Sequence, residues 1–114
     1  MKDNMLEFFP FSYFQINTKG SILVSSKRAQ ALFNIPLDLL NIVHIEDQSK
    51  ALEFLTSFIH NEPLTTSLRL QTVNGSFTNF TCTINWEQSI GHLVCIEKHP
   101  LISSFIEVKN RTLL

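Results

Sequence analysis

The feature that most constrains the fold is a pair of alternating apolar segments on either side of the dipeptide Asn74-Gly75. In residues 64–72 the apolar side chains fall on even-numbered positions, and residues 79–86 resume this alternation after the dipeptide. A period of two is typical of a strand with one buried face, and Asn-Gly is the strongest short hairpin signal. The pattern therefore predicts an antiparallel hairpin that buries one of its faces.

A third apolar segment, residues 92–96, follows a turn that we place at Gly91. This segment is apolar on both faces, which is typical of a central strand. Cys82 and Cys95 then fall on strands that the topology makes neighbours. We interpret them as two small buried hydrophobic residues, with a redox pair as the alternative.

The first third of the chain predicts a second hairpin and a short helix. Residues 13–17 and 21–25 are β-type segments on either side of a turn. Residues 27–34 then carry apolar side chains at helical spacing, with Ser25 or Ser26 as the N-cap.

The clearest helical periodicity lies in residues 47–59. The apolar positions recur at the spacing of one helix face, so we expect them to point inward together. They are Ala51, Leu52, Leu55, Phe58 and Ile59.

The element order is thus two strands, short helices, one longer helix and three strands. This order predicts the class α+β, with a five-stranded antiparallel sheet and helices packed on one face. The chain of 114 residues is long enough for one such domain and too short for two.

Composition excludes several classes of function. Nine Lys and Arg residues against ten Asp and Glu residues give a net charge of −1, so direct binding to nucleic acid is not expected. Three scattered glycines leave no phosphate-binding loop. We find neither a signal peptide nor an apolar stretch of the roughly 18 residues that a membrane span needs. A cytoplasmic protein with reduced cysteines is the expectation.

Residues 10–98 resemble a PAS domain. Each matching segment is short, and the resemblance rests on their order along the chain. Ser25-Ser26 stands where the family usually has Asn, and Asn17 stands where it usually has Asp. The segments are the turn at Gly20 with Ile22, the helix residues Ala29, Leu32 and Phe33, the sequence Val43-His44-Ile45-Glu46-Asp47, the hairpin from Arg69 through Asn74-Gly75 to Phe77, and Trp86.

The resemblance implies a sensory and dimerisation module that regulates an attached effector in signal transduction or transcription control. Family members occur with histidine kinases of two-component systems, transcription activators, cyclases and phosphatases. They hold a small ligand or cofactor between the sheet and the helices, or none. Covalent flavin chemistry is not expected, because residues 39–43 contain no cysteine, and haem is not expected, because residues 48–59 contain no histidine. The cofactor stays unknown.

Apolar side chains on the predicted inward faces are the candidate ligand-binding residues. Few polar residues accompany them, and Gln15, Ser25 and Thr66 are the inward candidates. This lining favours either a small apolar ligand or a filled core that serves protein–protein contact. The candidate residues are Phe14, Ile16, Leu40, Val43, Leu55, Leu70, Phe80 and Ile84.

His44 and Asp47 are the pair that an enzyme would use. No third ligand or nucleophile lies at motif spacing, so we predict neither a catalytic nor a metal site. We expect Asp47 or Glu46 to satisfy amides at the helix N-terminus. His92 and His99 flank a strand and are expected to be exposed.

Both ends of the chain predict helices beyond the PAS-like unit. We assign residues 1–9 to an N-terminal flanking helix and 99–114 to a C-terminal linker helix that leads to a following effector domain. Their apolar stripes favour a homodimer through the terminal helices. The alternative is a stand-alone domain that binds a small ligand without effector coupling. A third hypothesis, an enzyme acting through His44 and Asp47, is disfavoured by the apolar inward stripe of the longer helix.

Overall fold

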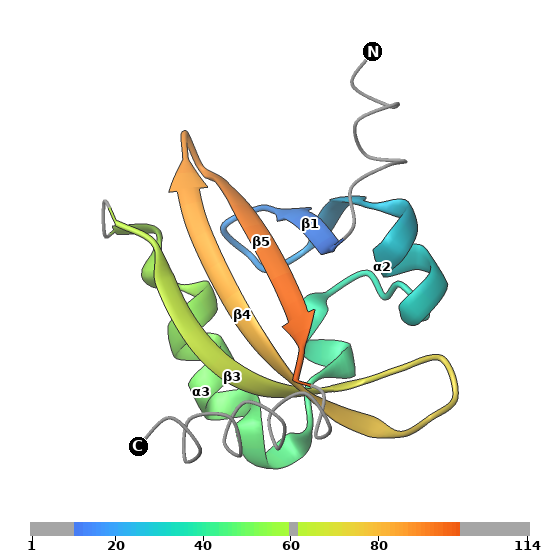
Figure 1. The fold of residues 1–114 in the computed structure, drawn as a ribbon. Helices are drawn as coiled ribbons and strands as arrows, with labels where there is room; N and C mark the ends of the chain where they lie inside the picture. Colours follow the sequence, from blue (N-terminus) through green and yellow to red (C-terminus); the bar gives the residue numbers. More distant parts are fainter. Residues whose placement is uncertain (1–10, 60–61, 99–114) are drawn as a thin grey trace, which may run out of the picture.

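The computed structural model describes residues 11–59 and 62–98, and the side chain of Ile59 is not part of that description. Five antiparallel strands form one sheet in the order β2-β1-β5-β4-β3, and the helices lie on one side of it (Figure 1). The α+β class and the five-stranded sheet are confirmed. The predicted terminal helices, 1–9 and 99–114, lie outside the described residues.

The elements alternate as the sequence predicts, with small differences at their ends. The strands are β1 (Ser12–Ile16), β2 (Ile22–Ser25), β3 (Leu64–Gln71), β4 (Phe77–Glu87) and β5 (Ile90–Glu97). The helices are α2 (Lys27–Leu32) and α3 (Gln48–Leu55), with the 3-10 turns η1 (Leu39–Ile42), η2 (Ile45–Asp47) and η3 (Ser57–Ile59).

The core lies between the inner face of the sheet and the helices. Residues that face each other across the strands share this inner face, as in the row Phe14, Leu93 and Ile84. All three side chains are fully buried. The alternation that predicts the strands therefore also identifies the face that the helices cover.

The turn between β4 and β5 lies at Gln88-Ser89, and the prediction of a turn at Gly91 is wrong. Both turn residues have positive φ, at 49° and 69°, as in the two-residue turns that suit hairpin twist. Gly91 lies inside β5 and faces Trp86. A Cβ at this position would come within 2.9 Å of the Trp86 ring and 3.0 Å of Ile16. Close packing requires this glycine, and a turn does not.

Helix α2 is tied to β1 by the buried hydroxyl of Ser26. Its Oγ accepts hydrogen bonds from the N–H groups of Tyr13 (3.0 Å) and Ala29 (3.2 Å), and it donates to the carbonyl of Phe11 (3.1 Å). Ser26 is thus the N-cap, one of the two predicted. The helix ends earlier than predicted, because Phe33 leaves it in an extended conformation and is buried.

The longer helix is shorter than predicted and turns a different face inward. Continuous α-helix stops at Leu55. Ala51, Phe54 and Leu55 are the buried residues of α3, whereas Leu52 is 53% exposed. Phe58 is also exposed. The inward stripe follows i, i+3 and i+4 from Ala51, so Leu52, one residue farther round, faces away from the sheet.

Candidate functional site

The eight predicted lining residues converge on one region of the core. Seven of them are buried in a single apolar cluster, and Leu40 packs against it while partly exposed. They come from β1, η1, α3, β3 and β4 and from Val43 after η1. The structure thus brings the set together, and its role in binding a ligand stays a prediction.

The polar residues predicted to point inward divide between the two faces of the sheet. Gln15 lies on the outer face, because it alternates with the buried Phe14 and Ile16, and its amide donates to the Tyr13 hydroxyl at 2.9 Å. The expectation that it faces the core is therefore wrong. Thr66 pairs with the buried Cys82, and Ser25 pairs with Phe14, which places both on the inner face.

A groove of about 170 Å³ opens where the β1–β2 turn, η1 and α3 meet. Leu40 and Leu55 line it together with Leu52, so two predicted residues reach from the core to this hollow. The other lining residues are Thr18, Lys19, Gly20, Asp38 and Thr56. The three leucines give the groove an apolar wall, and Lys19 and Asp38 bring opposite charges to it.

The groove wall on the hairpin side is fixed by backbone hydrogen bonds. The Asn17 side chain accepts from the N–H groups of Lys19 (2.9 Å) and Ser21 (3.0 Å), and Gly20 adopts a φ of +83°. The carbonyl of Gly20 then accepts from the N–H of Leu39 at 3.1 Å. These contacts hold the turn and η1 at a defined separation.

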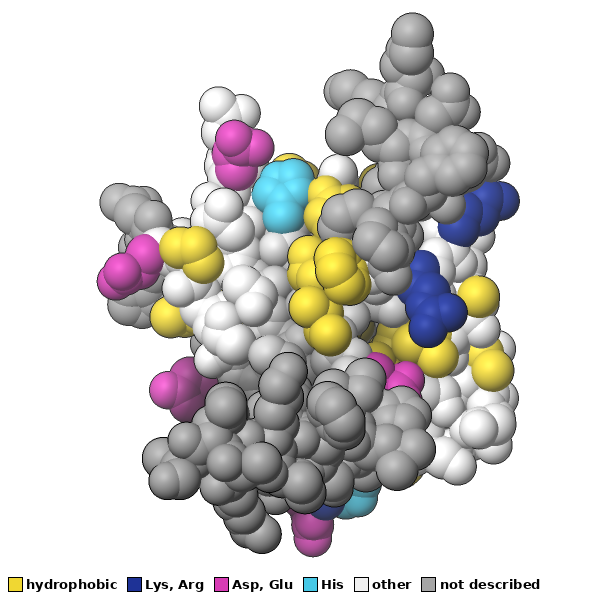
Figure 2. Space-filling model, in the orientation of Figure 1, with side chains coloured by type: hydrophobic (Ala, Val, Ile, Leu, Met, Phe, Trp, Pro, Cys, Tyr) yellow, Lys and Arg dark blue, Asp and Glu magenta, His cyan; other side chains and the backbone are white. Residues whose placement is uncertain are grey.

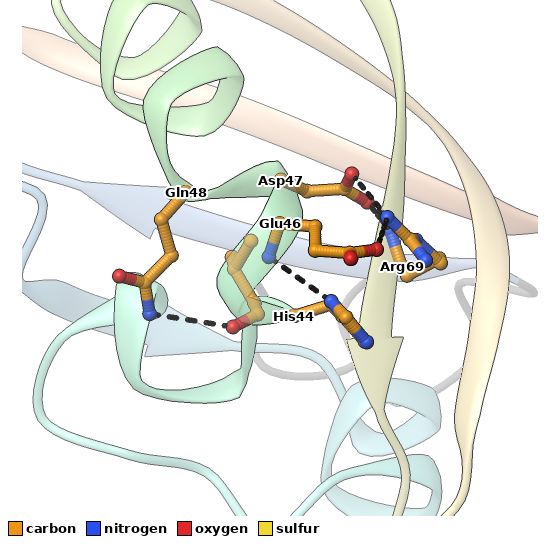
Figure 3. A network of polar contacts seen from close by, with 6 residues as sticks. His44, Glu46, Asp47, Gln48 and Arg69 are labelled. Atoms are coloured by element: carbon orange, nitrogen blue, oxygen red, sulfur yellow. Dashed lines mark hydrogen bonds and ion pairs between the residues drawn. The ribbon is translucent and has the colours of Figure 1, made fainter.

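An ion pair holds the other end of α3 against β3. The Asp47 carboxylate accepts hydrogen bonds from the Arg69 backbone N–H (2.8 Å), Nε (3.1 Å) and Nη2 (2.9 Å). Glu46 lies 3.3 Å from the same guanidinium. Figure 3 shows both carboxylates directed at Arg69. The hydrogen bonds from the Arg69 side chain hold the pKa of Asp47 well below its usual range.

His44 has a structural role next to this ion pair. Its Nδ1 accepts from the Glu46 N–H at 3.1 Å and so caps η2 (Figure 3). Its ring meets Phe77 edge-on at 4.8 Å. Asp47 makes no capping hydrogen bond, so the prediction that Asp47 or Glu46 caps the helix is wrong. Arg69, two residues before the end of β3, outcompetes the helix amides as a charged bidentate donor.

The described residues contain no group of three His, Cys, Asp or Glu side chains that would hold a metal ion. In the same residues, no helix is long and apolar enough to cross a bilayer.

Cys82 and Cys95 face each other on β4 and β5, as predicted, and both are free and buried. In an antiparallel pair of strands, opposite residues alternate between pairs that share backbone hydrogen bonds and pairs that do not. Asn79 and Lys98 form a hydrogen-bonded pair, so Cys82 and Cys95, three positions along the ladder, form a pair without backbone hydrogen bonds. In such pairs the side chains come closest. Contact with Cys82 and burial raise the pKa of the Cys95 thiol. The thiolate is therefore disfavoured at neutral pH.

The outer face of the sheet is more polar than the inner face. The Tyr13 hydroxyl and His92 Nδ1 are 2.7 Å apart, and the two rings stack. His92 thus lies inside β5 and half-buried, so the expectation of an exposed residue beside the strand is wrong. His99 lies outside the described residues.

In Figure 2 hydrophobic side chains gather in the middle of the visible face. The outward residues of β5 include Val94 and Ile96.

Trp86 is the residue of the site region that sequence reasoning did not select. Its ring packs on the core beside Gly91 and meets Phe58 edge-on at 5.6 Å. Its even position on β4, with Phe80, Cys82 and Ile84, was the signal that places it on the inner face. Its Nε1 is buried and has no hydrogen-bond partner among the described residues.

Comparison with solved structures identifies the fold. A domain of a sensory box sensor histidine kinase/response regulator from Geobacter sulfurreducens superposes with a TM-score of 0.71 at 14% identity, covering 83% of this chain and 90% of that one. The PAS domain of an HTR-like protein from Haloarcula marismortui gives 0.68 at 13% identity, covering 85% and 88%. The chain has the PAS fold.

A third PAS structure of the same shape was solved with a bound molecule. It is the PAS domain of the quorum-sensing receptor RpfR from Cronobacter turicensis in complex with BDSF, with a TM-score of 0.67 at 9% identity and coverage of 78% of this chain and 94% of that one. At such identities the likeness concerns the fold. No family model and no curated protein matches the sequence.

Proposed function

We propose that this chain is a PAS-type sensory and dimerisation module that regulates an attached effector in signal transduction or transcription control. The observation that carries the proposal is a PAS fold whose predicted lining residues open onto a groove through Leu40 and Leu55. Ligand occupancy would be felt by α3 and η1, which both line the groove. The module acts in the cytoplasm, and any catalysis belongs to another domain.

The ligand of this proposal is small and mostly apolar. The groove of about 170 Å³ has three leucines in its lining, and the residues behind it form an apolar core. Burial of apolar surface is then the main source of affinity. The complex of the RpfR PAS domain with BDSF is a precedent for this fold as a small-molecule receptor.

The test uses α-methylstyrene, a compact hydrocarbon, as the probe. We expect it to shift backbone amide NMR signals of the groove residues at millimolar concentration. Leu40→Trp fills the groove and abolishes these shifts. The matched control is Leu37→Trp, because Leu37 is 78% exposed and outside the groove lining. Shifts that persist in Leu40→Trp, or their absence in the wild type, would contradict the proposal.

Dimerisation through residues 1–9 and 99–114 forms a separate part of the proposal. Light scattering on the whole chain is expected to give twice the monomer mass of 13.1 kDa. A monomer at all concentrations, together with binding of the probe, would favour the alternative of a stand-alone ligand-binding domain.

A further inference from the structure

The buried indole N–H of Trp86 is a hydrogen-bond donor that the described residues leave without an acceptor. Buried indole groups normally find a partner, and an unmet buried donor calls for an explanation. The ring meets Phe58 edge-on at 5.6 Å, and its far edge and the Ile16 side chain both lie close to where a Cβ on Gly91 would be, so these neighbours are apolar.

Trp86 does not itself line the groove, but two chain segments near its ring continue into the groove lining. Ile16, which approaches Gly91 beside the Trp86 ring, directly precedes the turn whose residues Thr18, Lys19 and Gly20 line the groove. Phe58, in edge contact with Trp86, follows the groove residues Leu55 and Thr56 by one short turn. Two chain segments, one after Ile16 and one before Phe58, therefore connect the surroundings of Trp86 to the groove.

The charges that line the groove do not favour an ion there. The buried carboxylate of Asp47 is at the opposite end of α3 and is taken by Arg69. Lys19 and Asp38 line the groove with opposite signs, so their fields oppose each other. A charged group carried inward from the groove would lose its water without gaining a counter-ion, which is costly.

We propose that the ligand is a neutral, mostly apolar molecule with one hydrogen-bond acceptor, such as a ketone, aldehyde or ester oxygen, which accepts from Trp86 Nε1. The inference rests on the proposed function and adds the ligand class. The apolar body supplies burial at Leu40 and Leu55, and the single acceptor satisfies the indole N–H. This N–H and the Ser12 hydroxyl are the two buried side-chain groups that lack a partner among the described residues. Trp86 thereby selects carbonyl compounds over hydrocarbons of equal shape.

The test compares acetophenone with α-methylstyrene, which has the same shape but carries a methylene group in place of the carbonyl oxygen. Trp86 is the one tryptophan of the chain, so the ¹⁵N–¹H spectrum has a single indole signal that reports on this donor. We expect acetophenone to bind about tenfold more tightly than the hydrocarbon, the size of one satisfied buried donor. We also expect acetophenone alone to move the indole proton downfield.

Trp86→Phe keeps an aromatic ring and removes the donor. We expect this variant to bind both probes with equal affinity. If the variant fails to fold, the indole signal of the wild type still decides the question. Equal binding of both probes by the wild type with an unmoved indole signal would overturn the inference while leaving the proposed function intact. Binding of neither probe would overturn both.

Discussion

The two ends of α3 are attached to the domain by different forces. At the N-terminal end, Asp47 forms hydrogen-bonded ion-pair contacts with Arg69 of β3. At the C-terminal end, Phe54 and Leu55 are held by burial, and the groove opens beside them. Charged contacts with several hydrogen bonds fix direction, whereas apolar contacts tolerate some rearrangement. The difference assigns anchoring to the N-terminal end of the helix. Under the proposed function, the C-terminal end is the one that responds to a ligand.

The largest effect is expected at the buried end. Phe54→Ala removes a ring that is 5% exposed and should lower the free energy of unfolding by about 3–4 kcal/mol. Leu52→Ala, two residues earlier on the exposed face, should cost less than about 1 kcal/mol. Urea denaturation measures both. Equal losses would mean that the helix turns its other face to the sheet.

Asp47→Ala tests the charged end. It leaves the Arg69 backbone N–H and guanidinium without their carboxylate, and we expect a loss of about 2–3 kcal/mol in the free energy of unfolding. The control is Glu46→Ala, whose side chain is 71% exposed and contacts the same guanidinium; its cost should stay below about 1 kcal/mol. A small loss for Asp47→Ala would show that burial alone anchors the whole helix.

Gly91→Ala tests how tightly the buried end is packed. The new methyl group meets the far edge of the Trp86 ring and Ile16, and overpacking of this kind costs about 1–2 kcal/mol. In a Trp86→Phe background the ring atoms responsible are absent, so the cost should shrink. Thermal denaturation of the four proteins in this cycle gives the coupling. An unchanged cost in that background would place the strain at Ile16 instead.

Lowering the pH is expected to have the smallest effect of these tests, and it acts on the charged end of α3 alone. The folded state lowers the pKa of Asp47, so the stabilisation is complete above the unfolded-state value of about 4 and is lost as pH falls below it. The difference in unfolding free energy between the wild type and Asp47→Asn should therefore narrow below about pH 4. The difference between the wild type and Phe54→Ala should stay constant, and a parallel narrowing would contradict the comparison.

Much of the fold could be predicted because strand alternation and the Asn74-Gly75 turn are local signals. The alternation indicates both the strand and its buried face, and the dipeptide indicates where the hairpin turns. The turn predicted at Gly91 was wrong because glycine occurs both in turns and at sites of close packing. Only the position of the Trp86 ring distinguishes the two cases. Leu52 misled because an apolar side chain at helical spacing fits a wide stripe, whereas the sheet covers only the narrower face through Ala51, Phe54 and Leu55.

The candidate site was predictable to the extent that it coincides with the core. The candidates were the apolar side chains on the predicted inward faces of strands and helices, and residues such as Phe14 and Ile84 are buried. The groove depends on how the Gly20 turn stands against α3, which is a tertiary distance that no local pattern contains. The pairing of Arg69 with Asp47 joins residues 22 positions apart. The unmet Trp86 donor is defined by the surroundings of one atom.

The Gln88-Ser89 turn has a consequence for the order of folding. Two non-glycine residues in left-handed backbone conformations disfavour this turn in the unfolded chain, whereas Asn74-Gly75 favours the turn between β3 and β4. The β3–β4 hairpin should then form early and serve as the template on which β5 is added. Mutational φ-values near Gly75 should accordingly exceed those near Ser89, and the last strand to join would be the one that connects both halves of the sheet.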